Sequence, residues 1–271
     1  MSSPIILITG ANTGLGLETV NSLFRSSRKY TVLLGGRNLD KATAAAKQVK
    51  KEYTQSESVV IPVQIDIEDD ASIEKLKERV EKEFGRLDVL VNNAGGQFDQ
   101  QLYKGALGMR EMWNKSWDVN VTGTYILTHS LIPLLLKSSD PRILFITSGT
   151  STLTETTNLA VPVNKSPDQK GWPKDVATFN GLGIPAYRSV KTGLNMMMRE
   201  WLRVLKEDGV KCWAVSPGML ATGLGTGDPE FLRKLGALEP SVGADFVRSV
   251  VEGDRDGDVG LAVRKAGVQP W

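Results

Sequence analysis

Short apolar runs alternate with longer amphipathic segments along this chain, and the alternation restricts the fold more than any other feature. The apolar runs contain few polar residues, as strands do when helices bury both of their faces. The segments between them place apolar residues at helical spacing, as Ile73, Leu76, Val80 and Phe84 do. Strands that alternate with helices in this way predict an α/β fold with a doubly wound parallel sheet.

Seven strands and six helices are expected. The strands are Ile5–Ile8, Thr31–Leu34, Val59–Ile65, Val89–Val91, Arg142–Thr147, Lys211–Val215 and Val259–Ala262. The helices are Leu15–Ser26, Leu39–Tyr53, Ala71–Phe84, Trp117–Lys137, Ala186–Glu207 and Val242–Glu252. No linker rich in Gly, Pro or Ser divides the chain, so we expect a single domain over residues 1–271. Residues 151–185 carry several Pro and Gly without a period, and an irregular segment of that length is usually functional or disordered rather than a simple connection.

The composition excludes several kinds of function. Lys and Arg number 33 against 31 Asp and Glu, a net charge of +2, so no electrostatic footprint for nucleic acid or an anionic membrane is visible. One Cys and one His argue against a disulfide, a metal cluster or a His-based catalytic triad. The longest apolar run, Leu131–Leu136, is far shorter than the ~20 residues that span a bilayer, and no secretory leader is recognisable. We therefore expect a cytoplasmic protein without a metal.

A glycine-rich turn joins the first strand to the first helix: Thr9-Gly10-Ala11-Asn12-Thr13-Gly14-Leu15-Gly16. Glycine permits a tight turn and close approach to a ligand, and the helix N-terminus offers N–H donors and a positive dipole end to a pyrophosphate. Glycine also serves ordinary turns, but the strand-turn-helix context favours a dinucleotide site. We expect a Rossmann-type arrangement whose cofactor-binding half covers about residues 1–140.

Tyr187 and Lys191 are four residues apart, so on a helix they share one face. A phenol has an ordinary pKa of ~10, too high for ready proton transfer at neutral pH. A nearby ammonium favours the phenolate and should lower that pKa, which would make Tyr187 a general acid–base. The alternative for an isolated pair of this kind is an ordinary surface contact.

Six motifs occur together in one order. They are the turn with its Gly-x3-Gly-x-Gly spacing, Asn92-Asn93-Ala94-Gly95, Asn120, Ser148, Tyr187-x3-Lys191, and Ser216-Pro217-Gly218 with Thr222. Over about residues 5–222 this set resembles the short-chain dehydrogenase/reductase superfamily. The resemblance implies an NAD(P)-dependent oxidoreductase whose catalytic and substrate half covers about residues 141–271.

The resemblance also implies roles for single residues. Tyr187 would protonate a carbonyl oxygen as hydride arrives from the nicotinamide, and Lys191 would lower the pKa of Tyr187 and hold the nicotinamide ribose. Ser148 would hydrogen-bond the substrate oxygen, and Asn120 would anchor a water in the proton relay. The implied cofactor contacts are Gly10, Asn12, Thr13, Gly14, Leu15, Gly16, Asp66, Ile67, Asn93, Ala94, Gly95, Tyr187, Lys191, Pro217, Gly218 and Thr222.

The end of the second strand bears on the choice of cofactor. A carboxylate there would bind the adenosine 2′-hydroxyl of NAD, but the sequence is Leu34-Gly35-Gly36-Arg37-Asn38. The planar guanidinium of Arg37, with Asn38 beside it, suits a 2′-phosphate. NADP-using relatives often carry a second basic residue at the position of Thr13, and this chain does not. We expect NADP(H); the alternative is that Arg37 is a solvated loop residue.

The separation of Ser148 and Tyr187 is 39 residues, far more than in most relatives. The insertion resembles in position that of the carbonyl-reductase branch, where it covers helix faces used for oligomerisation. We expect a lid-like loop over about 151–185 and a monomer or homodimer, the alternative being a decorative surface loop. The other expected pocket walls, Gln97–Trp113 and Met219–Leu238, are mostly apolar, which favours a neutral, fairly apolar substrate.

The leading hypothesis is an NADPH-dependent reductase of a ketone or aldehyde, or the reverse alcohol oxidation. The style of the chain, including Gly267-Val268-Gln269-Pro270-Trp271, resembles fungal reductases of secondary metabolism. One alternative is another biosynthetic step on the same scaffold, either imine reduction or a cofactor-assisted cyclisation or isomerisation. A second is a regulatory protein that senses NADP without turnover. The complete set of Ser148, Tyr187 and Lys191 favours ordinary carbonyl reduction.

Overall fold

The computed structural model describes residues 3–167, 170–172, 174 and 183–271. Within them the strands form one sheet of eight, in the order β3-β2-β1-β4-β5-β6-β7-β8. Their bounds are β1 Ile5–Ile8, β2 Thr31–Gly36, β3 Val59–Gln64, β4 Val89–Asn92, β5 Arg142–Ile146, β6 Lys211–Ser216, β7 Ala262–Arg264 and β8 Gly267–Val268. Neighbouring strands from β3 to β7 are parallel, and β8 pairs antiparallel with β7. The doubly wound parallel sheet is confirmed, with one short strand more than expected.

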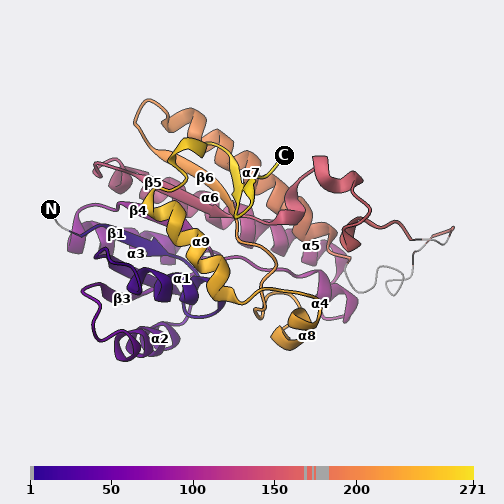
Figure 1. The fold of residues 1–271 in the computed structure, drawn as a ribbon, viewed down its shortest axis with the longest axis horizontal. Helices are drawn as coiled ribbons and strands as arrows, with labels where there is room; N and C mark the ends of the chain where they lie inside the picture. Colours follow the sequence, from indigo (N-terminus) through magenta and orange to yellow (C-terminus); the bar gives the residue numbers. More distant parts are fainter. Residues whose placement is uncertain (1–2, 168–169, 173, 175–182) are drawn as a thin grey trace.

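Two layers of helices cover the two faces of the sheet (Figure 1). Helices α1 (Gly14–Phe24), α2 (Leu39–Glu52) and α9 (Pro240–Glu252) pack on one face, and α3 (Asp70–Phe84), α6 (Gly123–Leu135) and α7 (Pro185–Leu205) on the other. Successive strand residues enter opposite cores: Ile6 and Ile8 join the first, and Ile5 and Leu7 the second. The strands are apolar throughout because each face buries its own set of side chains.

Strand β1 lies between β2 and β4, so the strand order reverses at this point. In open α/β sheets such a reversal leaves a crevice at the carboxyl ends of the strands, where ligands bind. The loops that follow β1, β4, β5 and β6 all begin at that edge. Two short helices, α4 (Asp99–Tyr103) and α8 (Pro229–Lys234), lie at the same end of the molecule as the projecting segment 149–167 (Figure 1).

The helix predicted over Trp117–Lys137 is present but starts earlier and is interrupted by a π-helical turn. Helix α5 (Met109–Trp117) is followed by a π-helical turn over Asp118–Thr122, and α6 begins only at Gly123. A Cβ added to Gly123 would lie 2.0 Å from the carbonyl oxygen of Ile67, so the chain passes here closer than any side chain allows. The wider turn places Asn120 at the crevice, in keeping with the frequent use of π-turns at functional sites.

Other differences concern short elements. The seventh strand was expected at Val259–Ala262 but lies at Ala262–Arg264, and helices α4, α5 and α8 were not predicted. These helices span only five, nine and six residues, too few for a helical period to be recognised. None of the helices in the described ranges has the length and apolar character needed to cross a bilayer.

The long insertion begins with three short 3₁₀ turns, Gly149–Ser151, Thr154–Thr157 and Pro162–Asn164. Part of the predicted lid-like loop over 151–185, namely 168–169, 173 and 175–182, lies outside the described residues. The described part is attached to α7, because the side chain of Arg188 on this helix donates to the carbonyl oxygen of Thr150 at 3.2 Å and to that of Val163 at 3.1 Å.

Candidate active site

The glycine-rich turn leaves the N-terminus of α1 open toward the crevice. Thr13 precedes the helix with extended backbone, is exposed, and makes no side-chain bond to the first turn. The first N–H groups of α1 therefore remain available to an anion. Gly10 has a φ of 62°, and a Cβ on Gly16 would lie 2.6 Å from Nδ2 of Asn93. Both positions therefore require glycine, and the turn is shaped to receive a phosphate group.

Thr9 connects this turn to the loop after β4. Its Oγ1 accepts hydrogen bonds from the backbone N–H groups of Asn93 at 3.1 Å and Ala94 at 2.9 Å. In return, Nδ2 of Asn93 donates to the carbonyl oxygen of Thr9 at 2.7 Å. These hydrogen bonds hold the two loops together as one rigid unit, which forms the floor of the crevice. Thr9 stood in the sequence motif but was not predicted as a site residue; its place before the first glycine was the signal.

The loop after β6 reaches the same turn from the other side of the crevice. Gly218 has a φ of 99°, so the chain turns sharply after Pro217. Thr222 then lies against Gly14, with its Cβ 3.8 Å from where a Cβ on Gly14 would be. The glycine-rich turn, the loop after β4 and the loop after β6 are therefore neighbours, although about two hundred positions separate the first from the last.

Arg37 lies at the far end of the crevice, beyond β2. Asn12 of the glycine-rich turn packs on Gly36, with its Oδ1 3.0 Å from the position of an added Cβ. The Arg37 side chain is 71% exposed and forms an ion pair with Glu68 at 3.5 Å. Asn38 caps α2 by accepting from the backbone N–H of Lys41 at 2.9 Å. Arg37 is thus within reach of a ligand, while the side chain of Asn38 already has a structural role.

Asp66 and Ile67 follow β3 at the same edge. Oδ1 of Asp66 accepts from the backbone N–H of Glu68 at 3.1 Å, and the Asp66 N–H donates to Oγ of Ser72 at 2.9 Å. Ile67 is buried beside the start of α6. The backbone here is held rigidly, and Asp66 remains partly exposed.

Asn120, Gly95 and Lys191 meet at the centre of the crevice. A Cβ added to Gly95 would lie 2.8 Å from Oδ1 of Asn120 and 3.3 Å from Nζ of Lys191. Asn120 Nδ2 donates to the carbonyl oxygens of Gly96 and Ser116, both at 2.9 Å, and its Oδ1 accepts from the Gly96 N–H at 3.2 Å. These bonds fix Asn120, and its Oδ1 retains room for a second donor, such as a water.

Tyr187 lies in the first turn of α7, and Lys191 follows one turn later. Lys191 is buried, its Nζ donates to the carbonyl oxygen of Ile146 at 2.9 Å and it lies 5.7 Å from the centroid of the Tyr187 ring. Burial lowers the pKa of the Lys191 ammonium to about 8. Its position joins the end of β5 to the catalytic face of α7.

The pKa of Tyr187 differs from the expectation. Burial raises it to about 12, and a hydrogen bond with Ser148 acts in the opposite direction. The pKa is therefore raised overall rather than lowered, because removal from water penalises the phenolate more than its surroundings stabilise it, and the effect of Lys191 on it stays a prediction. Tyr187 is therefore a protonated phenol at neutral pH.

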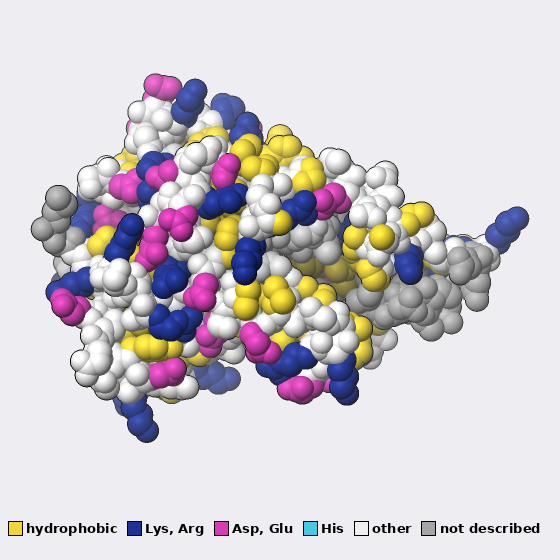
Figure 2. Space-filling view, in the orientation of Figure 1, with side chains coloured by type: hydrophobic (Ala, Val, Ile, Leu, Met, Phe, Trp, Pro, Cys, Tyr) yellow, Lys and Arg dark blue, Asp and Glu magenta, His cyan; other side chains and the backbone are white. Residues whose placement is uncertain are grey.

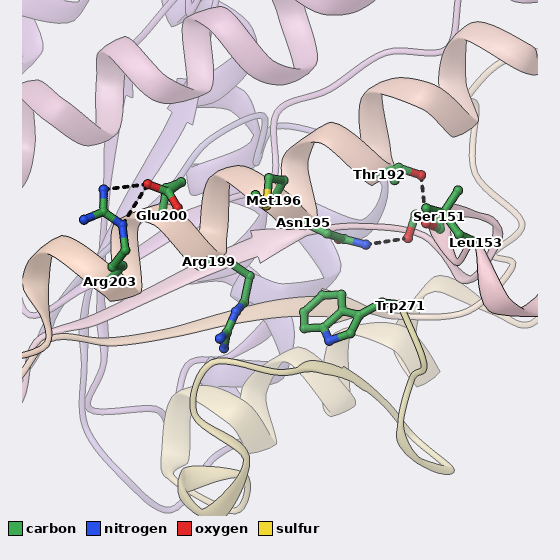
Figure 3. A pocket seen from close by; sticks show the side chains of 9 residues that line it. All are labelled: Ser151, Leu153, Thr192, Asn195, Met196, Arg199, Glu200, Arg203 and Trp271. Atoms are coloured by element: carbon green, nitrogen blue, oxygen red, sulfur yellow. Dashed lines mark hydrogen bonds and ion pairs between the residues drawn. The ribbon is translucent and has the colours of Figure 1, made fainter.

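The turn after Ser148 is anchored by buried polar residues. The hydroxyl of Thr192 donates to the carbonyl oxygen of Ser151 at 2.7 Å, and Nδ2 of Asn195 donates to Oγ of Ser151 at 3.0 Å (Figure 3). Nε2 of Gln269, 1% exposed, donates to the carbonyl oxygen of Ser148 at 3.1 Å. No sequence motif marked Gln269 as part of the site, because its partners lie over a hundred residues earlier.

An open hollow of about 530 Å³ lies beside this turn, lined by Ser151, Leu153, Met196, Arg199 and Trp271 among others (Figure 3). None of the four predicted catalytic residues lines it. Its walls come from α7, from the turn after Ser148 and from Trp271.

The six motifs thus surround one crevice, and comparison with known proteins gives the family. The family described as short chain dehydrogenase matches residues 4–160, more than half of the chain. The chain is a short-chain dehydrogenase/reductase. Two fungal members of the family are each 45% identical to it over 98% of its length and 97% of theirs: tropE of Talaromyces stipitatus and eupG of a Phoma species. The resemblance to fungal members of the superfamily is confirmed.

Solved structures agree with this short-chain dehydrogenase in fold. The NADPH-bound carbonyl reductase from chicken fatty liver superimposes with a TM-score of 0.74 at 21% identity, with full coverage of both chains. Salutaridine reductase from Papaver somniferum gives 0.72 at 22% identity and covers 96% of this chain and 99% of the other. At such identities the likeness concerns the fold alone.

Proposed function

We propose that this short-chain dehydrogenase reduces a ketone or aldehyde on a neutral, fairly apolar small molecule with NADPH, and catalyses the reverse alcohol oxidation with NADP. The observation that carries the proposal is the cluster of Ser148, Tyr187, Lys191 and Asn120 at the crevice. The open N-terminus of α1 and the close approach at Gly95 fit a dinucleotide. NADPH, when bound, supplies the hydride.

The residues of the chain supply the proton and its stabilisation. The carbonyl oxygen accepts hydrogen bonds from the hydroxyls of Ser148 and Tyr187, and the O–H bond of Tyr187 breaks as negative charge develops on that oxygen. The raised pKa of Tyr187 keeps this proton in place until then. The phenolate that forms is stabilised by Ser148 and by the ammonium of Lys191, and Asn120 holds a water that leads a proton back through Lys191.

NADP is favoured over NAD by the end of β2. Arg37 is the exposed cation there, and β2 ends in Gly35 and Gly36 without a carboxylate. The chicken carbonyl reductase of the same fold is described as NADPH-bound, whereas a 3-ketoacyl reductase from Brucella melitensis is described as complexed with NADH. The fold accepts either cofactor, so the proposal of NADP rests on the local charge at Arg37.

The walls of the crevice favour an apolar substrate. Exposed apolar side chains gather on the loop after β6 and on α8, beside the insertion (Figure 2). They are Met219, Leu224, Phe231, Leu235 and Leu238. Covering apolar area of this kind with a ligand contributes about 25 cal/mol per Å² to the binding free energy.

We further propose a cytoplasmic monomer or homodimer.

The test follows NADPH fluorescence against 2,2,2-trifluoroacetophenone, menadione and 3,4-dihydroisoquinoline, with NADH in parallel and Tyr187→Phe as the matched variant. We expect fast oxidation of NADPH by a ketone or quinone, and a loss of about 10²-fold or more in Tyr187→Phe. Reduction of the imine alone, unchanged in Tyr187→Phe, would replace the proposal with an imine reductase. Tight binding of NADPH without turnover of any probe would indicate a sensor.

A further inference from the structure

Helix α7 lacks a capping residue of its own. Ile184 precedes it without a side-chain bond to the first turn, and Pro185 at its first position has no N–H. The next two N–H groups, of Ala186 and Tyr187, donate to Asp99: the first to Oδ1 at 2.9 Å and the second to Oδ2 at 3.2 Å. The cap of the catalytic helix thus comes from α4, 87 residues earlier.

Asp99 is buried in an unusual setting for a carboxylate. Its side chain is 0% exposed, and among the described residues no Lys, Arg or His forms an ion pair with it. An unpaired buried charge is costly unless hydrogen bonds and dipoles compensate for it. Here the compensation is the positive end of α7 and its two N–H donors, so both carboxylate oxygens are committed to the turn that carries Tyr187.

Asp99 is also connected to the loop after β4. It opens α4 at the end of the loop that begins with Asn93, Ala94 and Gly95, and hydrogen bonds to Thr9 join that loop to the glycine-rich turn. Through Asp99 the floor of the crevice is therefore connected to the backbone of Tyr187. A small shift of this turn would move the phenol relative to Ser148, and misplacement of reacting groups by about 1 Å can reduce rates by about 10²-fold.

We propose that Asp99 is a positioning residue, which fixes the first turn of α7 so that the Tyr187 hydroxyl meets the substrate oxygen. This inference rests on the proposed role of Tyr187. Asp99 itself acts through the helix backbone and contributes to the rate of the chemical step without contacting the substrate.

The test uses Asp99→Ala and Asp99→Asn, with Asp69→Ala as the matched control. Asp69 also caps a helix, by accepting from the Ala71 N–H at 3.0 Å at the start of α3, and its loss should lower the melting temperature with kcat within twofold. The measurements are hydrogen–deuterium exchange of peptides covering 184–190, the dissociation constant of NADPH, and kcat and KM for 2,2,2-trifluoroacetophenone.

We expect Asp99→Ala to raise exchange at residues 186–188 and to lower kcat at least tenfold, with NADPH affinity within threefold of wild type. Asp99→Asn should fall between, since its one oxygen still accepts from one N–H, and it serves alone if Asp99→Ala does not fold. Wild-type kcat in the Asn variant, or loss of kcat with exchange raised throughout the protein, overturns the proposal. Tyr187→Phe in parallel separates the two claims: if it keeps its rate, the proposed function fails, whereas exchange still reports whether Asp99 holds the turn.

Discussion

The guanidinium of Arg37 lies 3.5 Å from the carboxylate of Glu68, where β2 and β3 end beside the crevice. The carboxylate of Glu68 also lies 3.4 Å from Nζ of Lys115, so it is shared by two cations. An exposed ion pair of this kind contributes about 0–1 kcal/mol. Glu68 therefore holds Arg37 in place but competes with any phosphate for it.

The first prediction concerns cofactor preference. Arg37→Ala removes a charge-assisted bond to a 2′-phosphate, worth about 1.5–3 kcal/mol, so KM for NADPH should rise about tenfold or more while KM for NADH stays within twofold. Glu68→Gln should act in the opposite direction, since it frees Arg37. Steady-state kinetics with both cofactors measures the ratio. An unchanged NADPH to NADH ratio in Arg37→Ala would contradict the role given to Arg37.

Sequence reasoning succeeded where one local pattern determined one element. The apolar runs identified the sheet because each strand is buried on both faces, and motifs at strand ends converged because parallel strands end at one edge. Gln269 could not be found in this way, since it acts through backbone groups far away in the chain. The raised pKa of Tyr187 was missed for a related reason: the spacing to Lys191 is visible in the sequence, but the burial that outweighs it is not.

The second prediction concerns the insertion. Arg188, next to Tyr187, donates to Thr150, Val163 and Asn164, the last at 2.8 Å, and burial lowers its pKa. Arg188→Met should release 163–164 from α7 and raise KM for the bulky ketone 2-acetylnaphthalene about five- to tenfold. NADPH affinity, measured by fluorescence, should remain within twofold.

Arg188→Lys is the matched control. It keeps the charge but loses the planar fork that reaches three acceptors, so its KM for 2-acetylnaphthalene should fall between those of wild type and Arg188→Met. If cofactor affinity changes and substrate KM does not, the insertion serves the cofactor and the lid-like role is excluded.

The third prediction concerns acid stability at the opposite edge of the sheet. Asp256 accepts hydrogen bonds from Arg142 at 2.9 Å and from Lys211 at 2.7 Å, and these lower its pKa from 3.8 to about 2. A carboxyl whose pKa is lower in the folded protein stabilises it fully above about pH 5, and the contribution disappears as the pH falls through about 2. Because Asp256 is 36% exposed, screening reduces its contribution to about 1 kcal/mol.

Urea unfolding of wild type and Asp256→Asn at pH 7, 5, 4 and 3 measures this contribution. The difference in unfolding free energy should be about 1 kcal/mol at pH 7 and 5 and about half of that by pH 3. A difference that is constant across this range would show that Asp256 acts by shape rather than by charge.

The last prediction uses Cys212, the one cysteine of the chain, as a reporter of the central sheet. It is 0% exposed within β6, and burial raises its pKa to about 12. Only the thiolate reacts with 5,5′-dithiobis(2-nitrobenzoic acid), so the folded thiol should be inert at pH 8 and labelling should require opening of the sheet. The labelling rate should then level off near pH 8.5, the ordinary thiol pKa, rather than rise tenfold per pH unit toward 12.

Asp256→Asn should raise the rate at pH 8 about fivefold, because a loss of about 1 kcal/mol increases the open population by that factor if opening involves global unfolding. Rapid labelling of the native protein would mean that β6 opens without unfolding, and a rate that is the same in both variants would mean that the Arg142–Asp256 pair does not hold this strand.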